Sequence, residues 1–324
     1  MKKKSAYSKV LVFGDMHLSD THRGRYKDYV GVCKAAMNTV EGIVKKEKPD
    51  AVCFAGDMIG VGNANIRSHE FLGEVLSFFK KLGKSADVWG LKGNHDISEY
   101  SDFDLMRDLN IIKTTADCDY IDIDGDFSKR LHLTDYGSEK RDYSLKEGSE
   151  NIVIAHNYFM IQGLSWNLYG KGYDTAGMTN LQGITSILSG HIHLPSTSVD
   201  KTTLVCGGDV KLAYLGCMTR PSGEDTDFVW YGVVTGLSEG ICLEPIQLGR
   251  VSDLLEDKPT VDELENKGRR EDLRESLECI LNARYEGADL HDKIKAFANA
   301  DDRVKALALK YLDMALESKQ LQKI

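Results

Sequence analysis

Five short segments of the chain carry side chains that can bind a metal ion or transfer a proton. In chain order they are Gly14-Asp15-Met16-His17, Gly56-Asp57, Gly93-Asn94-His95-Asp96, Ala155-His156-Asn157 and Gly190-His191-Ile192-His193. Their carboxylate, amide and imidazole groups suit Mn, Fe, Zn or Ni, and no cysteine falls within them. Asp-x-His and His-x-His place both side chains on one side of an extended backbone, so each pair can hold one ion.

The segments must be positioned by the elements that precede them. Residues 9–13 and 51–55 are rich in Val and Phe and end in Gly-Asp, which predicts buried strands that end in loops. Residues 26–46 and 71–82 space apolar side chains by three and four, which predicts helices, and residues 88–91 predict another strand. This alternation favours βαβ units and a largely parallel sheet.

Beyond about residue 115 the pattern changes to strands with few helices, which a second sheet packed on the first would explain. The expected strands are 120–123, 131–133, 151–155, 184–188, 203–206, 228–234 and 241–246. Because the carboxyl ends of neighbouring strands share one edge of such a sheet, the five segments should converge there. A pair of metals needs a bridging carboxylate, and Asp57, after the middle strand, is placed to supply it.

Taken singly, each segment is a weak indication of function, since a histidine after a strand is usually a hydrogen-bonded core residue. The ordered set resembles the calcineurin-like metallophosphoesterase superfamily, whose motifs run Asp-x-His, Gly-Asp, Gly-Asn-His-Asp/Glu, His and Gly-His-x-His. The resemblance covers residues 9 to about 195. It implies an α/β fold: a two-sheet β-sandwich flanked by helices, here with a small capping region and a C-terminal helical tail.

The resemblance also implies two divalent metal ions at one edge of the sandwich. It assigns the first metal to Asp15, His17, Asp57 and His193. It assigns the second metal to Asp57, Asn94, His156 and His191. Mn is the metal that it favours, with Fe, Zn, Ni or Mg as alternatives. Such a pair lowers the pKa of a bridging water and clamps the phosphoryl oxygens.

Two further residues would act without binding metal. His95 is similar to the family residue that contacts the phosphate or leaving group, and it would donate a proton to the leaving alkoxide. Asp96 would orient His95; a local role as a turn acceptor is an equal alternative.

Three features resemble one branch of this superfamily, the SbcD-type repair nucleases. Asp15-Met16-His17-Leu18 is followed by His22, Gly24 and Arg25. The segment Tyr214-Leu215-Gly216-Cys217-Met218 resembles that branch's Tyr-x-Gly-Ser-Pro, with Cys217 and Met218 in place of Ser-Pro, and a Gly-Glu follows at Gly223. A short capping strand region (227–248) and a charged helical tail come next. As a further departure, Gly60 stands where some members have a histidine.

This branch implies a Mn-dependent DNA nuclease that acts in recombination or break processing. Its partners would be DNA and an SbcC-like coiled-coil ATPase bound through the C-terminal helices, and a homodimer is also compatible with the resemblance. The alternative is a free-standing phosphatase or phosphodiesterase acting on a small molecule or phosphoprotein. The chain's net charge of -9 gives no support to binding DNA through a broadly positive surface.

Composition divides the 324 residues into three parts. We expect a catalytic core over 1–200, remaining core strands and a small cap over 201–250, and a helical segment over 251–324. Residues 157–180 predict a long loop. Seven scattered cysteines fit free thiols in a reducing compartment. With no membrane-length apolar run and no apolar stretch after the basic residues 1–4, we expect a cytoplasmic protein.

Overall fold

The computed structural model describes residues 7–21, 27–60, 65–97, 101–138, 143–157, 159, 182–197, 202–203, 209–219 and 228–249. All of them belong to the first of two compact units, Met1–Glu256. Three predicted features lie outside the described residues: positions 22–25, the loop at 157–180 apart from residues 157 and 159, and the tail at 251–324.

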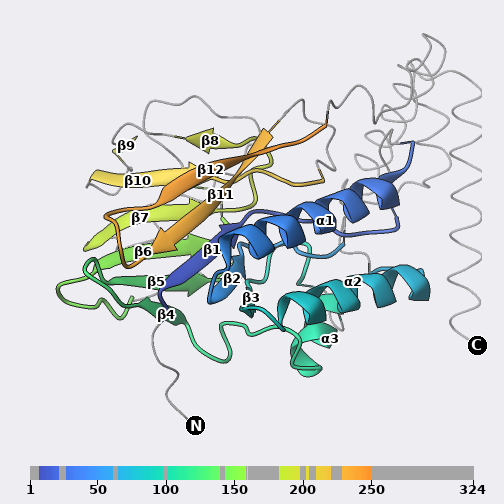
Figure 1. The fold of residues 1–324 in the computed structure, drawn as a ribbon, viewed down its shortest axis with the longest axis horizontal. Coiled ribbons are helices and arrows are strands. Elements are labelled where there is room, and N and C mark those ends of the chain that lie inside the picture. Colours follow the sequence, from blue (N-terminus) through green and yellow to red (C-terminus); the bar gives the residue numbers. More distant parts are fainter. Residues whose placement is uncertain are drawn as a thin grey trace, which may run out of the picture. The chain divides into compact units, whose positions relative to one another are not determined.

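The first sheet has five strands in the order β12-β11-β1-β2-β3 (Figure 1). Their bounds are Lys9–Phe13 (β1), Ala51–Phe54 (β2), Asp87–Gly90 (β3), Phe228–Thr235 (β11) and Cys242–Gln247 (β12). β1, β2 and β3 are parallel, as the predicted βαβ units require, whereas β11 runs antiparallel to β1. The expectation of a small cap at 227–248 is therefore wrong: β11 and β12 belong to the first core sheet, in which residues 231–235 of β11 pair with the whole of β1 and β12 pairs with β11.

The second sheet has seven strands in the order β4-β5-β6-β7-β10-β8, with β9 paired to β10. Their bounds are Tyr120–Ile123 (β4), Lys129–Thr134 (β5), Glu150–Ala155 (β6), Ile184–Ser189 (β7), Ser196–Thr197 (β8), Thr202–Thr203 (β9) and Asp209–Tyr214 (β10). β5, β6, β7 and β10 are parallel, and β4 and β8 are antiparallel. The strand predictions are thus confirmed, except that only the first residue of 203–206 is described and that β8 and β10 were not expected.

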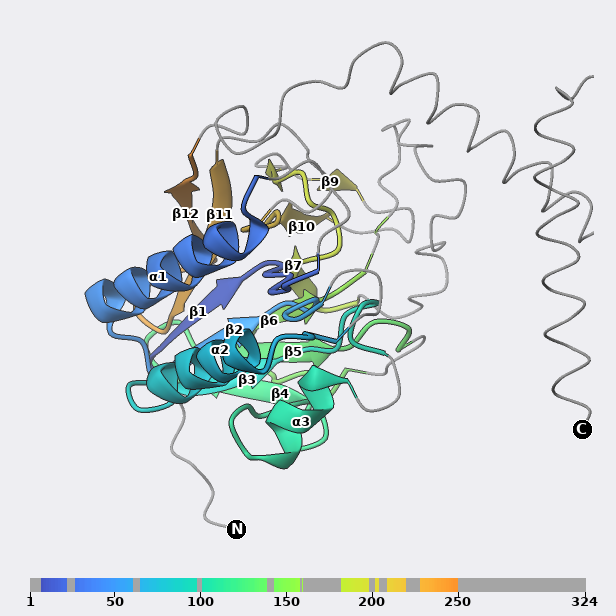
Figure 2. The same cartoon turned by 90° about the vertical axis from the view of Figure 1, so that its right-hand side faces the viewer.

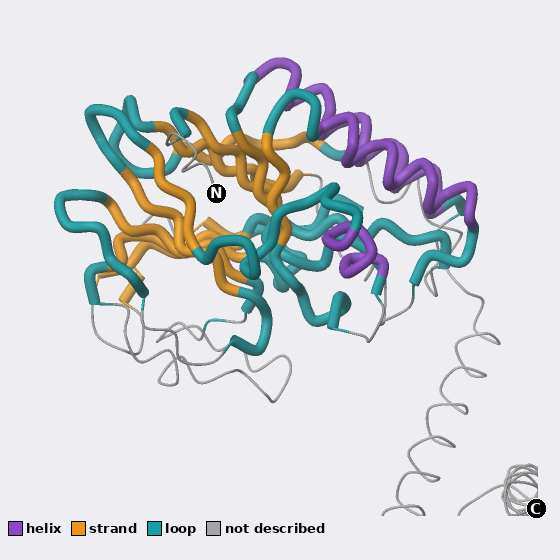
Figure 3. Tube along the Cα trace, turned by 90° about the horizontal axis from the view of Figure 1, so that it is seen from below, coloured by secondary structure: helices purple, strands orange, loops and turns teal. Residues whose placement is uncertain are grey.

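The helices cover the outer face of the five-stranded sheet. Their bounds are Tyr29–Glu47 (α1), His69–Leu82 (α2) and Asp102–Asp108 (α3). The two long helices begin where a side chain accepts a hydrogen bond from the first turn: Asp28 caps α1 and Ser68 caps α2. The spacing of apolar residues predicts both helices, α1 and α2. Figures 2 and 3 show the helices together on one side of the strands. In the part of the chain that the structure describes, no helix has both the length and the hydrophobicity to cross a lipid bilayer.

Alternation along the strands builds the layers of the sandwich. In β1, Leu11 and Phe13 join the cluster formed with α1 and α2, whereas Val10 and Val12 join the cluster between the sheets. The period of two explains why every second side chain faces the other layer. Each fully buried Val, Leu or Phe contributes about 1.5–3 kcal/mol relative to exposure. The strand ends, and the loops that leave them, are therefore held in fixed positions.

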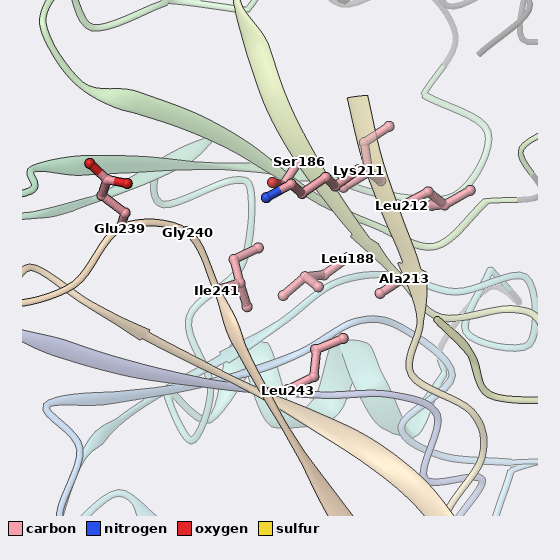
Figure 4. A pocket seen from close by; sticks show the side chains of 10 residues that line it. Ser186, Leu188, Lys211, Leu212, Ala213, Glu239, Gly240, Ile241 and Leu243 are labelled. Atoms are coloured by element: carbon pink, nitrogen blue, oxygen red, sulfur yellow. The ribbon is translucent and has the colours of Figure 1, made fainter. Parts of the chain in front are cut away.

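One cavity, of about 330 Å³, lies between the two sheets and away from the five segments (Figure 4). β7 and β10 line one side through residues such as Leu188 and Ala213, and Ile241, just before β12, and Leu243 of β12 line the other. The lining contains none of the predicted metal ligands or catalytic residues.

Candidate metal centre

The five segments meet at the carboxyl ends of β1, β2, β3, β6 and β7, as predicted. Backbone hydrogen bonds join the loops: His17 N donates to Asp57 O (2.9 Å), and Gly190 N donates to Ala155 O (3.0 Å). Side chains far apart in the sequence are thereby brought into contact: His17 and His193 are 176 positions apart, and their Nε2 atoms lie 3.1 Å from each other.

The backbone of this region is strained at its ligand positions. Five described non-glycine residues have positive φ, and three of them are predicted ligands: His17 (43°), Asp57 (45°) and His191 (75°). L-residues rarely adopt this conformation, which costs about 1–3 kcal/mol and persists only where contacts of the surrounding structure impose it. Strain of this kind concentrates at functional sites, so the backbone supports the assignment that the motifs suggest.

Glycines in the motifs allow the loops to approach each other closely. A Cβ at Gly93 would lie 2.0 Å from Asp57 Oδ1, and a Cβ at Gly190 would lie 2.2 Å from Asp15 Oδ1. Any other residue would displace a predicted ligand. The Gly-Asn-His and Gly-His-x-His patterns therefore have a steric explanation in this fold.

Asp57 occupies the middle of the cluster. Its Oδ2 lies 3.1 Å from His156 Nε2, 3.5 Å from His17 Nε2 and 4.0 Å from His95 Nε2. Its Oδ1 accepts a hydrogen bond from His95 N at 2.8 Å. The carboxylate thus faces ligands on both sides, in the position that a bridging ligand needs.

The first half-site comprises Asp15, His17 and His193. His193 Nε2 lies 3.5 Å from Asp15 Oδ2 and 3.1 Å from His17 Nε2. The carbonyl oxygen of Gly60 lies 2.8 Å from His17 Nδ1 and can only accept, so Nδ1 carries the proton and Nε2 offers a lone pair. Gly60, the position that departs from some relatives, therefore orients a predicted ligand through its backbone.

The second half-site comprises Asn94, His156 and His191. Asn94 Oδ1 lies 3.0 Å from His156 Nε2 and 2.8 Å from His191 Nδ1. His156 Nδ1 lies 2.7 Å from the carbonyl oxygen of Ala55, which fixes its tautomer in the same way as Gly60 fixes that of His17. Tyr136, a residue that no sequence motif indicated, has its ring centroid 5.6 Å from that of His191.

Burial keeps most of these imidazoles neutral. It lowers the pKa of His17 to about 4, that of His191 to about 4 and that of His193 to about 3. A neutral imidazole is the form that binds a metal ion. Three of the four predicted histidine ligands therefore need to lose no proton at neutral pH.

His156 and Asp15 behave differently. Burial lowers the pKa of His156, but the Asp57 and Asp15 carboxylates more than reverse this and raise it to about 9. Burial raises the pKa of Asp15 to about 8. Burial also opposes ionisation of Asp57, yet His156 and His17 hold its pKa well below the usual range. Without a cation, the cluster therefore retains protons that a metal ion would displace.

The donor set fits divalent cations. In two groups of carboxylates and imidazoles, one donor atom from each residue lies within 4.8 Å of the donor atoms of the other two. The groups are Asp15, Asp57 and His156, and His17, Asp57 and His95. Lone pairs of nitrogen and oxygen that face each other in a buried space repel unless a cation lies between them. Such donors bind Zn, Mn, Fe or Ni, so this cluster, with Asp57 in both groups, fits the divalent metals that the resemblance implies.

His95 and Asp96 lie beside the metal ligands. The His95 side chain is 26% exposed, so it can reach a substrate at the surface of the site. Asp96 is buried, and its Oδ2 accepts a hydrogen bond from Gly93 N at 3.0 Å. This contact favours the local turn role of Asp96, and its role in orienting His95 stays a prediction. Burial and the nearby Asp57 raise the pKa of Asp96 to about 7.

Residues 214–219 hold the backbone of the first half-site by hydrogen bonds. The motif in this segment did not predict this role. Met218 N donates to Asp15 O (2.9 Å), and Thr219 Oγ1 donates to Met16 O (2.9 Å). Tyr29 Oη, from α1, lies 3.0 Å from His17 O and 2.9 Å from Thr219 Oγ1. The loop that carries Asp15 and His17 is thus fastened on two sides.

Comparison with known proteins agrees with this geometry. Residues 8–195 match the family model described as calcineurin-like phosphoesterase. No curated protein matches the chain. Similar solved structures include TT1561 of Thermus thermophilus, which is 10% identical, with 76% of this chain and 100% of that chain covered and a TM-score of 0.42. Another is Yfce, a phosphoesterase from E. coli, which is 13% identical, with 74% and 100% covered and a TM-score of 0.37. The family match spans more than half of the chain and all five segments, and the chain belongs to the calcineurin-like phosphoesterase family.

Proposed function

We propose that this phosphoesterase hydrolyses phosphodiester bonds in DNA, as an SbcD-type exo- or endonuclease that acts in recombination or double-strand-break processing. The observation that carries the proposal is the Tyr-x-Gly segment at 214–216, which resembles that branch and runs into the support of the first half-site. Gly216 has φ +83°, and a Cβ there would lie 3.2 Å from His193 O. The motif therefore has a structural role next to the predicted metal ligands.

The residues of the site divide the work of hydrolysis. Asp57 and the two half-sites would hold two divalent cations, with Mn²⁺ favoured by the resemblance. When bound, the cations supply Lewis-acid activation of water and neutralise charge on the phosphoryl oxygens. His95, partly exposed beside Asp57, donates a proton to the departing sugar oxygen. Asp57 positions His95 by accepting the hydrogen bond from its backbone N–H.

The proposal includes a partner. In the SbcD-type branch, a charged helical tail binds the coiled coil of an ATPase, and residues 251–324 would bind such a partner here. The acidic charge balance makes a partner or the bound cations the source of attraction for DNA. Co-purification of the chain with the product of a neighbouring reading frame, one that encodes a coiled coil between Walker A and Walker B halves, would support this part.

The experiment compares two substrates with the same enzyme. The purified chain, loaded with Mn²⁺, is given linear duplex DNA and, separately, a small aryl phosphodiester. We expect DNA degradation that is abolished in Asp57→Ala and retained in Asp124→Ala, which removes an exposed carboxylate elsewhere in the molecule. If DNA survives while the small ester is hydrolysed, the nuclease proposal is wrong and the free-standing phosphodiesterase takes its place.

A further inference from the structure

Cys217 is a buried thiol beside the first half-site. The resembling branch has serine at this position, and Cys217 is fully buried. Its Sγ belongs to a group with one ring nitrogen of His17 and one of His193, in which the three donor atoms lie within 4.8 Å of one another. Two ligands of one zinc ion lie at most about 4.4 Å apart, because Zn–S is about 2.3 Å and Zn–N about 2.1 Å. The thiol is therefore near coordination distance before any ion enters.

The backbone holds Cys217 in this position from both sides. Cys217 N donates to His193 O at 3.2 Å, and the next residue, Met218, donates from its N to Asp15 O at 2.9 Å. Asp15 and Cys217 are also partners in a parallel β-bridge. Bridge partners project their side chains to the same face, so the thiol and the Asp15 carboxylate point the same way.

The other buried thiols lack these neighbours. Cys33 Sγ lies 3.6 Å from Ser19 O and 4.0 Å from His17 O, which are carbonyl oxygens and not metal ligands in this cluster. Cys53 lies in the apolar cluster between the sheets. Of the buried cysteines that the structure describes, Cys217 alone belongs to a group of candidate metal donors.

We infer that Cys217 is an additional ligand of the first half-site and makes it select thiophilic cations such as Zn²⁺ or Cd²⁺ over Mg²⁺ and over Mn²⁺, the metal that the resemblance favours. On binding, the thiol proton leaves to solvent and the sulfur lone pair forms the bond to the cation. Thiolate donors favour Zn²⁺ and Cd²⁺, whereas carboxylate and amide oxygens suit Mn²⁺ and Mg²⁺. The second half-site has no sulfur donor among the described residues, so the two positions would differ in metal preference.

X-ray absorption of the zinc-loaded full-length chain tests this inference without substrate. We expect a sulfur shell at about 2.3 Å from zinc, beside nitrogen and oxygen at about 2.0–2.2 Å. A spectrum that contains only nitrogen and oxygen would overturn the inference, and it would leave the proposed DNA substrate untouched.

Variants identify which sulfur is bound. Cys217→Ser should abolish the sulfur shell and lower the preference for Zn²⁺ over Mn²⁺ by about tenfold or more, whereas Cys242→Ser, at an exposed cysteine, should change neither. A sulfur shell that persists in folded Cys217→Ser would contradict the inference. Because the wild-type spectrum stands without any variant, a folding defect in Cys217→Ser would not remove the test.

Discussion

The two half-sites share Asp57 but differ in how they are prepared for a cation. In the first, burial leaves His17 and His193 neutral, and their Nε2 atoms lie 3.1 Å apart. In the second, His156 has a pKa raised to about 9, and the amide oxygen of Asn94 lies between two imidazoles. The two half-sites therefore hold their displaceable protons on different groups: on the Asp15 carboxyl in the first and on the His156 imidazole in the second.

Removing the shared ligand should have the largest effect. Asp57→Ala should reduce activity by more than the roughly 10²–10⁴-fold that loss of a general acid costs, because both half-sites lose a donor. Metal content after equilibrium dialysis should fall from two ions per chain toward none. A variant that keeps both ions would show that Asp57 does not bridge.

His95 lies beside both half-sites, and its replacement should separate chemistry from metal binding. His95→Asn should lower turnover by about 10²–10⁴-fold with both ions retained. The exposed His69 provides a matched control, since His69→Asn should leave turnover unchanged. Loss of one ion from His95→Asn would make His95 a ligand, as its place in one donor group allows.

Single-ligand variants should empty one half-site at a time. His193→Ala should weaken the first position and His191→Ala the second, each by more than the roughly 10–100-fold that loss of an outer hydrogen-bonding partner costs. Isothermal titration calorimetry with the metal ion should show two binding events in the wild type and one in each variant. If both variants lose both events, the half-sites form a single cooperative unit.

The pH dependence of metal binding should distinguish the protons held by each imidazole. His156 and Asp15 bind protons below about pH 9 and pH 8, so a cation must displace them and its affinity should fall as pH is lowered through this range. His17 and His193, with pKa values of about 4 and 3, add no dependence above pH 5. Calorimetry in buffers of different ionisation enthalpy should count fewer protons released in His156→Asn than in the wild type. Affinity that is constant between pH 7 and 9 would contradict this account.

The smallest effect should come from the support of the first half-site. Tyr29→Phe removes a hydroxyl that lies against His17 O and Thr219 Oγ1, and it should lower the free energy of unfolding by about 1 kcal/mol. Denaturant unfolding measures this change. Metal affinity should fall severalfold at the first half-site only; an equal fall at the second would mean that Tyr29 acts on the whole fold.

Much of this arrangement could be predicted from the sequence because it follows from local patterns. Short apolar runs rich in Val, Ile or Phe predict β1, β2 and β6, and three-and-four spacing predicts α1 and α2. Convergence of strand ends then brings the five segments together. The sequence pattern does not predict α3, because its seven residues are too few for a clear periodicity.

The remaining features depend on contacts that local patterns do not encode. Periodicity identifies β11 as a strand but does not identify its partner. The partner is β1, which lies more than 200 positions away in the sequence. Nor does a local pattern predict β10, which lies beside β7 and leads into residues 214–219. Cys217 reaches the first half-site by the same tertiary route, through its β-bridge to Asp15.

A crystal structure of the chain grown with Mn²⁺ and Zn²⁺, with anomalous data at both absorption edges, would show whether Asp57 joins two metal ions. Two ions should lie about 3.5–4 Å apart on either side of the Asp57 carboxylate. One should contact His17 and His193, and the other His156 and His191. A single ion, or two ions that do not share Asp57, would contradict the account.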